Sequence, residues 1–322
     1  MQHSRGELIL EKMNATDKTW FSLTVLLLAA LACLAQPEAG MKRSESASSL
    51  SPLRSRRTVG GMMARRVPWQ AMVYLNESML DGGFSGGALV SDRWILSSGR
   101  SLFIRKSRRD ISGSHPLIPK IYLGISNRRY ANESNEYTVE KVVLHPRFQN
   151  QSDWDNDLAL IKLKKPVVIN DKVIPIPLPE RGQDITNIQS GVITGWGFGA
   201  NLTPAEILRY LTVPLLKSSD CKTAYEHDPL TPNVDNNMFC TEQTKYEENV
   251  CLGDAGGALA VKDKETGDIY AAGILSYDKA CRVNNYAVYM KISSYLPWIH
   301  SVMRGDTEKS AGQRADVMSK FQ

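Results

Sequence analysis

The stretch Glu248–Val261, ENVCLGDAGGALAV, has the form of a glycine-flanked turn that presents a catalytic nucleophile. Its central residue is Ala255, whose methyl group cannot attack a substrate. Covalent catalysis of this kind also needs a base beside the nucleophile, commonly a histidine that a carboxylate orients. The first question about the chain is therefore whether any catalytic chemistry remains.

The cysteines and histidines indicate disulfides rather than a metal centre. Cys33 lies in an apolar N-terminal run, and the other cysteines are an even set of four: Cys221, Cys240, Cys251 and Cys281. In an oxidising compartment these four predict two disulfides. There is no CxxC motif, and the five histidines are scattered without ligand spacing. We therefore expect no metal and no cofactor.

The chain divides into a leader, a spacer, one folded domain and a tail. Phe21–Ala35 is an uncharged apolar run of 15 residues, which is short for a membrane span and typical of a secretory signal. We predict a signal peptide over residues 1–35, with Met13 as an alternative start. Residues 36–57 are serine-rich and polar, which predicts a disordered propeptide or spacer that ends in a dibasic cleavage site. The folded domain is expected over 58–303, and a flexible tail over 304–322.

The formal net charge of +5 is modest, and its basic runs lie at 54–57, 105–109 and 128–129. No interleaved aromatic residues accompany these runs, so nucleic acid is not an expected partner. Because the long apolar run belongs to the predicted signal, we expect no membrane insertion either.

Short segments of β type recur between turn residues throughout the predicted domain, among them QAMVYL, KIYLGI, DLALIKL, GVITGWG and NYAVYMKI. Many short strands at close spacing favour an antiparallel barrel or sandwich, with Asp263–Asp268 as a hairpin turn. Ser293–Met303 predicts one C-terminal helix with a serine cap, Pro297 in its first turn and an apolar face formed by Leu296, Ile299 and Met303.

Several stretches of the domain resemble the trypsin-like serine protease family: TVGG at 58–61, WILSSGRSLF at 94–103, DNDLALIKL at 155–163 and GDAGGAL at 253–259. The resemblance extends over essentially all of Thr58–Met303, and the order of the pieces makes chance similarity negligible. It implies an all-β fold of two six-stranded antiparallel β-barrels followed by a C-terminal α-helix, which agrees with the strand pattern.

The resemblance also assigns the three catalytic positions. The serine position is Ala255, and the histidine position is Arg100, whose guanidinium stays protonated and cannot act as a base. The carboxylate is retained as Asp157. A buried carboxylate without a partner is strongly destabilising, so we predict an ion pair between Arg100 and Asp157. The chain is then a serine protease homologue and not an enzyme.

Other positions of the family are carried over in the same way. Cleavage between Arg57 and Thr58 would free an amine for a buried ion pair with Asp254, while the alternative is an uncleaved chain in which Asp254 is otherwise satisfied. The implied disulfides are Cys221 with Cys240 and Cys251 with Cys281.

Side-chain changes are expected in and around the former substrate site. Asn249 falls at the base of the specificity pocket, Ser276, Tyr277 and Asp278 on its wall, and Ala287 where glycine is common. Ser85 and Ser101 stand where the family has a disulfide in its first barrel.

Among family members without the triad, the sequence is similar to secreted plasma proteins that scavenge haemoglobin. WILSSGRSLF, VEKVVLHPRF and TKYEENVCLGDAGGALAV contain the similarity, together with YAAGILSYDKACRVNNYAVYMKI. The implied partner is a haemoglobin dimer, and the implied role is protection against haem-iron release and oxidative damage. A clearance receptor is also implied, although the segment between Cys221 and Cys240 is compact where mammalian members have an insertion that such a receptor uses.

Four sequons are plausible glycosylation sites on a secreted surface: Asn76, Asn132, Asn150 and Asn201. Two alternatives to haemoglobin scavenging stay open. One is another inactive protease-like ligand, such as a growth-factor-like protein, an antimicrobial or heparin-binding protein, or an inhibitor decoy. The other is an enzyme with its nucleophile elsewhere, for instance at Ser97 or Ser98, neither of which has a histidine nearby in sequence.

Overall fold

The computed structural model describes residues 62–64, 66–76, 83–102, 116–148, 154–180, 182–183, 185–199, 203–226, 231–244, 249–277 and 286–305. All of them belong to one compact unit, Arg56–Gln322. The predicted signal peptide, the spacer, the cleavage residues Arg57 and Thr58, and the tail from 306 onward lie outside the described residues.

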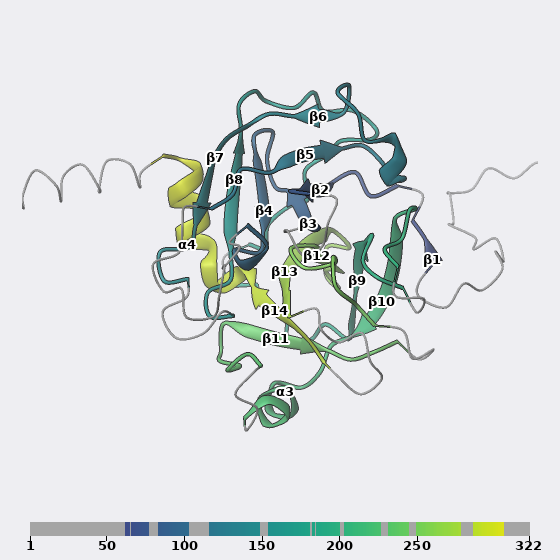
Figure 1. Ribbon diagram of the computed structural model, residues 1–322. Helices are drawn as coiled ribbons and strands as arrows, with labels where there is room; N and C mark the ends of the chain where they lie inside the picture. The colour runs from purple at the N-terminus through teal and green to yellow at the C-terminus, as the bar shows by residue number, and fades with distance from the viewer. Residues whose placement is uncertain are drawn as a thin grey trace, which may run out of the picture. The chain divides into compact units, whose positions relative to one another are not determined.

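Two antiparallel sheets form the domain (Figure 1), which confirms the all-β prediction. The first sheet has the order β6-β5-β2-β3-β4-β8-β7. Its strands are β2 (Gln70–Tyr74), β3 (Phe84–Leu89), β4 (Trp94–Ser97), β5 (Lys120–Leu123), β6 (Glu136–Tyr137), β7 (Val139–Leu144) and β8 (Ala159–Leu163). Every neighbouring pair in this sheet is antiparallel, both where a short connection joins the strands, as for β2 and β3, and where other strands intervene in the chain, as for β4 and β8.

The second sheet has the order β1-β10-β9-β12-β13-β14-β11. Its strands are β1 (Met62–Met63), β9 (Ser190–Gly195), β10 (Arg209–Pro214), β11 (Met238–Thr241), β12 (Ala258–Lys262), β13 (Ile269–Tyr277) and β14 (Ala287–Lys291). The predicted hairpin turn at Asp263–Asp268 joins β12 to β13, and the backbone N–H of Asp263 donates to the carbonyl of Asp268 at 2.8 Å.

Each sheet therefore has seven strands where six were expected. In the first sheet the additional strand arises because β6 and β7 are separated only by Thr138. In the second it is β1, a two-residue strand at the sheet edge that pairs with β10. The barrel-like architecture is unchanged by these short additions.

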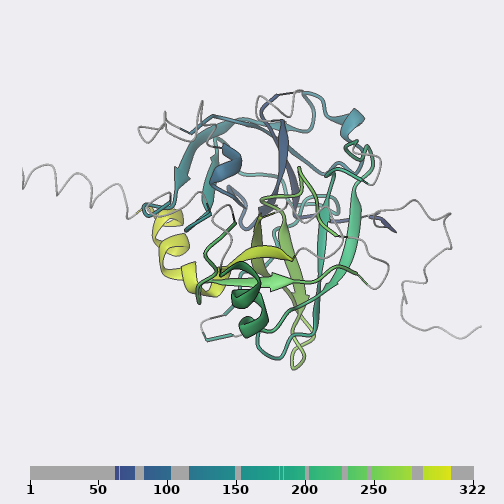
Figure 2. The ribbon, with the colours of Figure 1, turned by 60° about the horizontal axis from the view of Figure 1, so that its bottom comes forward.

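Helices lie outside the sheets, where their apolar faces extend the core. α3 (Ser218–Tyr225) packs beside β11, and α4 (Ile292–Met303), in yellow, packs beside β13 (Figure 2). Short 3₁₀ turns occur at Arg100–Leu102 and Arg128–Tyr130.

The predicted C-terminal helix is confirmed, but its start differs from the prediction. α4 begins at Ile292, its N-cap is Lys291 without a side-chain cap bond, and Pro297 lies inside the helix and not in its first turn. The serine cap was therefore wrong. β14 runs directly into α4, and Ile292 is fully buried in the core, so packing sets the start of the helix.

Candidate functional site

The turn around Ala255 keeps the backbone shape that the sequence predicts. Gly253 and Gly256 have φ values of 96° and 84°, which favour glycine. A Cβ atom on Gly256 would lie 2.3 Å from the carbonyl oxygen of Gly86 and from Oγ of Ser97. The carbonyl of Ala255 accepts the N–H of Gly86 at 2.7 Å, and Ala255 is buried. The turn is thus held tightly, with a methyl group at its centre.

Arg100 begins the 3₁₀ turn that follows β4, and it binds the carboxylate of Asp157 in two ways. Its backbone N–H donates to Oδ1 of Asp157 at 2.6 Å, and its Nε atom lies 3.6 Å from Oδ2. The same Nε donates to the carbonyl oxygen of Ser276 at 2.8 Å. The predicted ion pair between Arg100 and Asp157 is therefore confirmed.

Asp157 is completely buried, and both of its oxygens accept hydrogen bonds. Oδ2 accepts from the hydroxyl of Ser276 at 2.6 Å, in addition to its contact with Arg100. Asn156 before it has a φ of 51°, a left-handed conformation that asparagine tolerates better than most residues. The carboxylate is thus satisfied by the positive side chain, a backbone amide and a hydroxyl, as a buried charge requires.

The Ala255 turn and the Arg100–Asp157 pair meet at β13. The N–H of Gly256 donates to the carbonyl of Leu275 at 2.7 Å, while the next residue, Ser276, contacts both Arg100 and Asp157. Residues from three distant parts of the chain therefore converge, as the resemblance predicted. Among the described residues, the side chains at the three positions that the resemblance assigns to catalysis are a guanidinium, a carboxylate and a methyl group, and the hydroxyl of Ser276 is bound to the carboxylate.

Aromatic side chains cover the guanidinium of Arg100. Its Cζ atom lies 4.6 Å from the ring centre of Trp154, which favours a cation–π contact. Trp154 packs edge-on against Tyr277 at 5.1 Å, and Tyr277 against Tyr225 at 5.8 Å. All three rings are buried. The resemblance flagged Tyr277, whereas sequence reasoning missed Trp154 and Tyr225, although a tryptophan three residues before Asp157 was a readable signal.

Two residues that the resemblance assigns to the specificity pocket, Asn249 and Ala287, make contacts within the domain. The side-chain oxygen of Asn249 accepts the N–H of Val250 at 2.9 Å. Ala287 is fully buried in the core of the second sheet. Asp278 lies outside the described residues.

Asp254 lies beside a small cavity of about 40 Å³ that Asn249 also lines. Its carboxylate accepts the N–H groups of Gly197 at 2.8 Å and Cys251 at 3.0 Å. A Cβ atom on Gly195 would lie 1.9 Å from Oδ1 of Asp254, so glycine is required there. Since Thr58 lies outside the described residues, the ion pair between its amine and Asp254 stays a prediction.

The cysteines follow the predicted pairing as far as they are described. Cys221 of α3 is bonded to Cys240 of β11, with 5.7 Å between their Cα atoms. Cys251 is also disulfide-bonded, and Cys281 lies outside the described residues.

Ser85 and Ser101, which the resemblance places where the family has a disulfide, do not hydrogen-bond to each other in the described part of the chain. Oγ of Ser101 is 2.5 Å from Oγ of Ser98, whereas Oγ of Ser85 is buried without a hydrogen-bond partner among the described residues. A buried hydroxyl of this kind is destabilising.

The described sequons are accessible. Asn76 and Asn132 are exposed, whereas Asn150 and Asn201 lie outside the described residues. In the part of the chain that the structure describes, no group of acidic, histidine or cysteine side chains could hold a metal ion. The same residues include no helix that is long and apolar enough to span a membrane.

The fold and the site together define a homologue of the serine proteases, and the sequence model described as Trypsin matches residues 58–299. The curated haptoglobin of Mesocricetus auratus is 34% identical to this chain, over 77% of the chain and 70% of its own length. The haptoglobin of Cervus elaphus is 33% identical, over 77% of the chain and 61% of its own length. The haptoglobin of Canis lupus familiaris matches 78% of the chain at 32% identity, over 75% of its own length. The chain belongs to the haptoglobin group of the trypsin family.

Proposed function

We propose that this protein is a secreted, non-enzymatic scavenger of haemoglobin that limits haem-iron release and oxidative damage. The similarity to haptoglobins over 77% of the chain supports this proposal. The observation that supports its non-enzymatic part is the contact at the assigned histidine position, where Arg100 binds Asp157 at 3.6 Å and Trp154 covers the guanidinium. A scaffold altered in this way is suited to binding through its surface loops and not to turnover.

The absence of peptidase activity follows from the chemistry of two positions. Ala255 has no group that can form an acyl-enzyme, and Arg100 remains protonated and cannot take a proton from a nucleophile. Ser97, which was considered as a substitute nucleophile, is fully buried and donates its hydroxyl to the carbonyl of Gly86 at 2.8 Å. Ser98 is also buried, and its hydroxyl is hydrogen-bonded to that of Ser101.

Processing and export complete the proposal. We propose that the leader over residues 1–35 directs secretion into plasma and that cleavage after Arg57 frees Thr58 for Asp254. The exposed side chains of Asn76 and Asn132 are compatible with glycan attachment. A clearance receptor for the haemoglobin complex is part of the same proposal.

The test mixes the secreted full chain with haemoglobin and follows complex formation by size-exclusion chromatography with haem absorbance. We expect co-elution that persists on dilution, while myoglobin, a monomeric haem protein, elutes unchanged. Haemoglobin that elutes alone, beside a chain shown to be folded and glycosylated, would refute the proposal. A parallel assay with fluorogenic peptide substrates should show no hydrolysis.

A further inference from the structure

The segment that follows β8, which we call the 164–174 loop, crosses the end of the first sheet on a defined course. The N–H of Val167 donates to the carbonyl of Asp92 at 2.7 Å, and the N–H of Ile174 to that of Pro68 at 3.0 Å. Val167 and Val173 are buried in the core of the first sheet. The two ends of the loop are therefore anchored by backbone bonds and by side-chain packing.

A tight turn closes the tip of the loop. Asn170 and Val173 exchange backbone hydrogen bonds of 3.1 and 3.0 Å, and Oδ1 of Asn170 accepts the N–H of Lys172 at 2.9 Å. The amide of the same asparagine donates to the carbonyl of Val168 at 3.0 Å. Because the backbone is satisfied internally, the tip has a preformed shape and does not need a partner to order it.

This preformed tip exposes large apolar side chains to water. Val168 is 76% exposed and its neighbour Ile169 52% exposed, and Ile174 on the returning arm is 42% exposed. Exposing such side chains forfeits the free energy of burying them. Single exposed apolar residues need no explanation, but a group on one rigid loop is typical of a docking surface.

The loop is also basic. Lys164, Lys165 and Lys172 are exposed, and Asp171 is its acidic residue. Lys164 and Lys165 precede the exposed Val168 and Ile169 in the chain, and Lys172 follows them in the turn. Such a surface complements a partner that offers negative charge and an apolar layer together.

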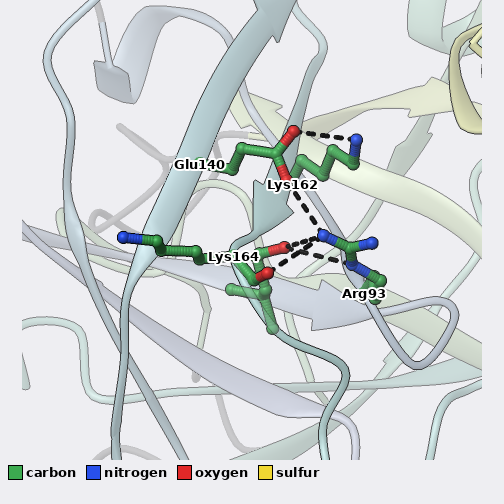
Figure 3. A network of polar contacts seen from close by, with 5 residues as sticks. Arg93, Glu140, Lys162 and Lys164 are labelled. Carbon is green, nitrogen blue, oxygen red and sulfur yellow. Dashed lines mark hydrogen bonds and ion pairs between the residues drawn. The ribbon is translucent and has the colours of Figure 1, made fainter.

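A network of polar contacts extends the positive charge onto the sheet (Figure 3). The carboxylate of Glu140 on β7 binds both Lys162 Nζ and Arg93 Nη2 at 2.9 Å. Two cations share this carboxylate, so one positive charge remains. Arg93 also donates to the carbonyl of Lys164 at 3.0 Å, and the ammonium end of Lys164 points away from the network. The network fixes the base of the 164–174 loop and leaves Lys164 directed outward.

We propose that the 164–174 loop docks peripherally on an anionic phospholipid surface. Val168 and Ile169 enter the headgroup layer, and Lys164, Lys165 and Lys172 lie against lipid phosphate and carboxylate groups. A sulfated polysaccharide would use the cations alone, whereas a lipid surface uses the cations and the exposed apolar tip together. The combination on one rigid loop therefore favours lipid over a soluble polyanion.

The test is co-sedimentation of the full chain with vesicles of phosphatidylcholine that contain about one-third phosphatidylserine. We expect binding to these vesicles, little binding to pure phosphatidylcholine, and loss of binding in high salt. Both Val168→Ser/Ile169→Ser and Lys164→Gln/Lys165→Gln/Lys172→Gln should weaken the apparent affinity by about tenfold or more.

Matched controls come from the hairpin between β12 and β13, which is likewise exposed. Ile269→Ser, at a residue that is 48% exposed, and Lys262→Gln/Lys264→Gln should bind vesicles like the parent chain. The proposal is overturned if the parent chain does not sediment with anionic vesicles. It is equally overturned if the Val168/Ile169 variant binds them normally while heparin competes, since that result defines a polyanion site.

Discussion

Arg100 and Asp157 are joined by a backbone hydrogen bond of 2.6 Å and by a side-chain contact of 3.6 Å between Nε and Oδ2. The same arginine reaches the carbonyl of Ser276 and lies over the ring of Trp154. Arg100, which the resemblance assigns to the histidine position, thus bridges the two sheets, because it follows a strand of the first and Ser276 lies on a strand of the second. The positions that the resemblance assigns to catalysis thus form a contact between the two sheets.

Removal of the Arg100 side chain should destabilise the domain. Arg100→Ala leaves the buried carboxylate of Asp157 without its cation, although the backbone N–H and Ser276 still bind it. We expect the free energy of unfolding to fall by about 2 kcal/mol, the contribution of a hydrogen-bonded contact with a charged group, measured by urea denaturation. As a control, Arg129→Ala removes an exposed pair with Glu206 and should change stability little. Equal effects of the two variants would show that the Arg100–Asp157 pair contributes no more to the free energy of unfolding than an exposed pair does.

Restoring the nucleophile alone should not restore activity. In Ala255→Ser the hydroxyl would occupy the centre of the turn, but Arg100 cannot accept its proton. We expect no labelling by a fluorophosphonate probe and no peptide hydrolysis, with active trypsin as the positive control. Stoichiometric labelling of the variant would contradict this expectation, because it would show that some group in the protein activates the serine.

Two buried serines should respond to substitution with opposite signs. Ser85→Ala removes a hydroxyl that has no partner among the described residues and should raise the free energy of unfolding by about 1 kcal/mol. Ser97→Ala removes a donor that binds the carbonyl of Gly86 and should lower it by about 1 kcal/mol. Thermal or urea unfolding measures both, and a destabilised Ser85 variant would show that this hydroxyl is satisfied after all.

Stability should fall in mildly acidic solution because of His145. Burial lowers the pKa of this residue from 6.5 to about 4, and Arg147 adds a smaller electrostatic effect. The ring packs against Tyr295 and Trp298, and its Nδ1 atom accepts the N–H of Arg147 at 3.3 Å, which a protonated ring cannot do.

Between the two pKa values the unfolded chain binds more protons than the folded chain, so stability declines as the pH falls from about 6.5 toward 4. Below the folded pKa this contribution no longer changes. Urea denaturation across that range should show a shallower decline in His145→Phe than in the parent chain. Identical slopes would mean that the pKa of His145 does not differ between the folded and unfolded states.

Much of the fold could be predicted because its signals are local or motif-based. Closely spaced β-type segments indicated the antiparallel architecture, and the motifs around Arg100, Asp157 and Ala255 indicated which residues converge. The pairing of Cys221 with Cys240 followed from the same resemblance and is confirmed. The strands and the turn could be predicted because they depend mainly on neighbouring residues, whereas the cysteine pairing and the convergence of distant residues were implied by the family resemblance.

Other features depended on contacts between distant residues. The start of α4 at Ile292, the cover of Trp154 over Arg100 and the buried hydroxyl of Ser85 are set by packing across the domain. The same holds for the 164–174 loop, where Val167 and Val173 turn inward and leave Val168 and Ile169 exposed. The sequence by itself determined the class of fold and, through the family resemblance, predicted that the catalytic serine and histidine are replaced. Tertiary structure decided which side chains are buried, because burial depends on surfaces that only the folded chain brings together.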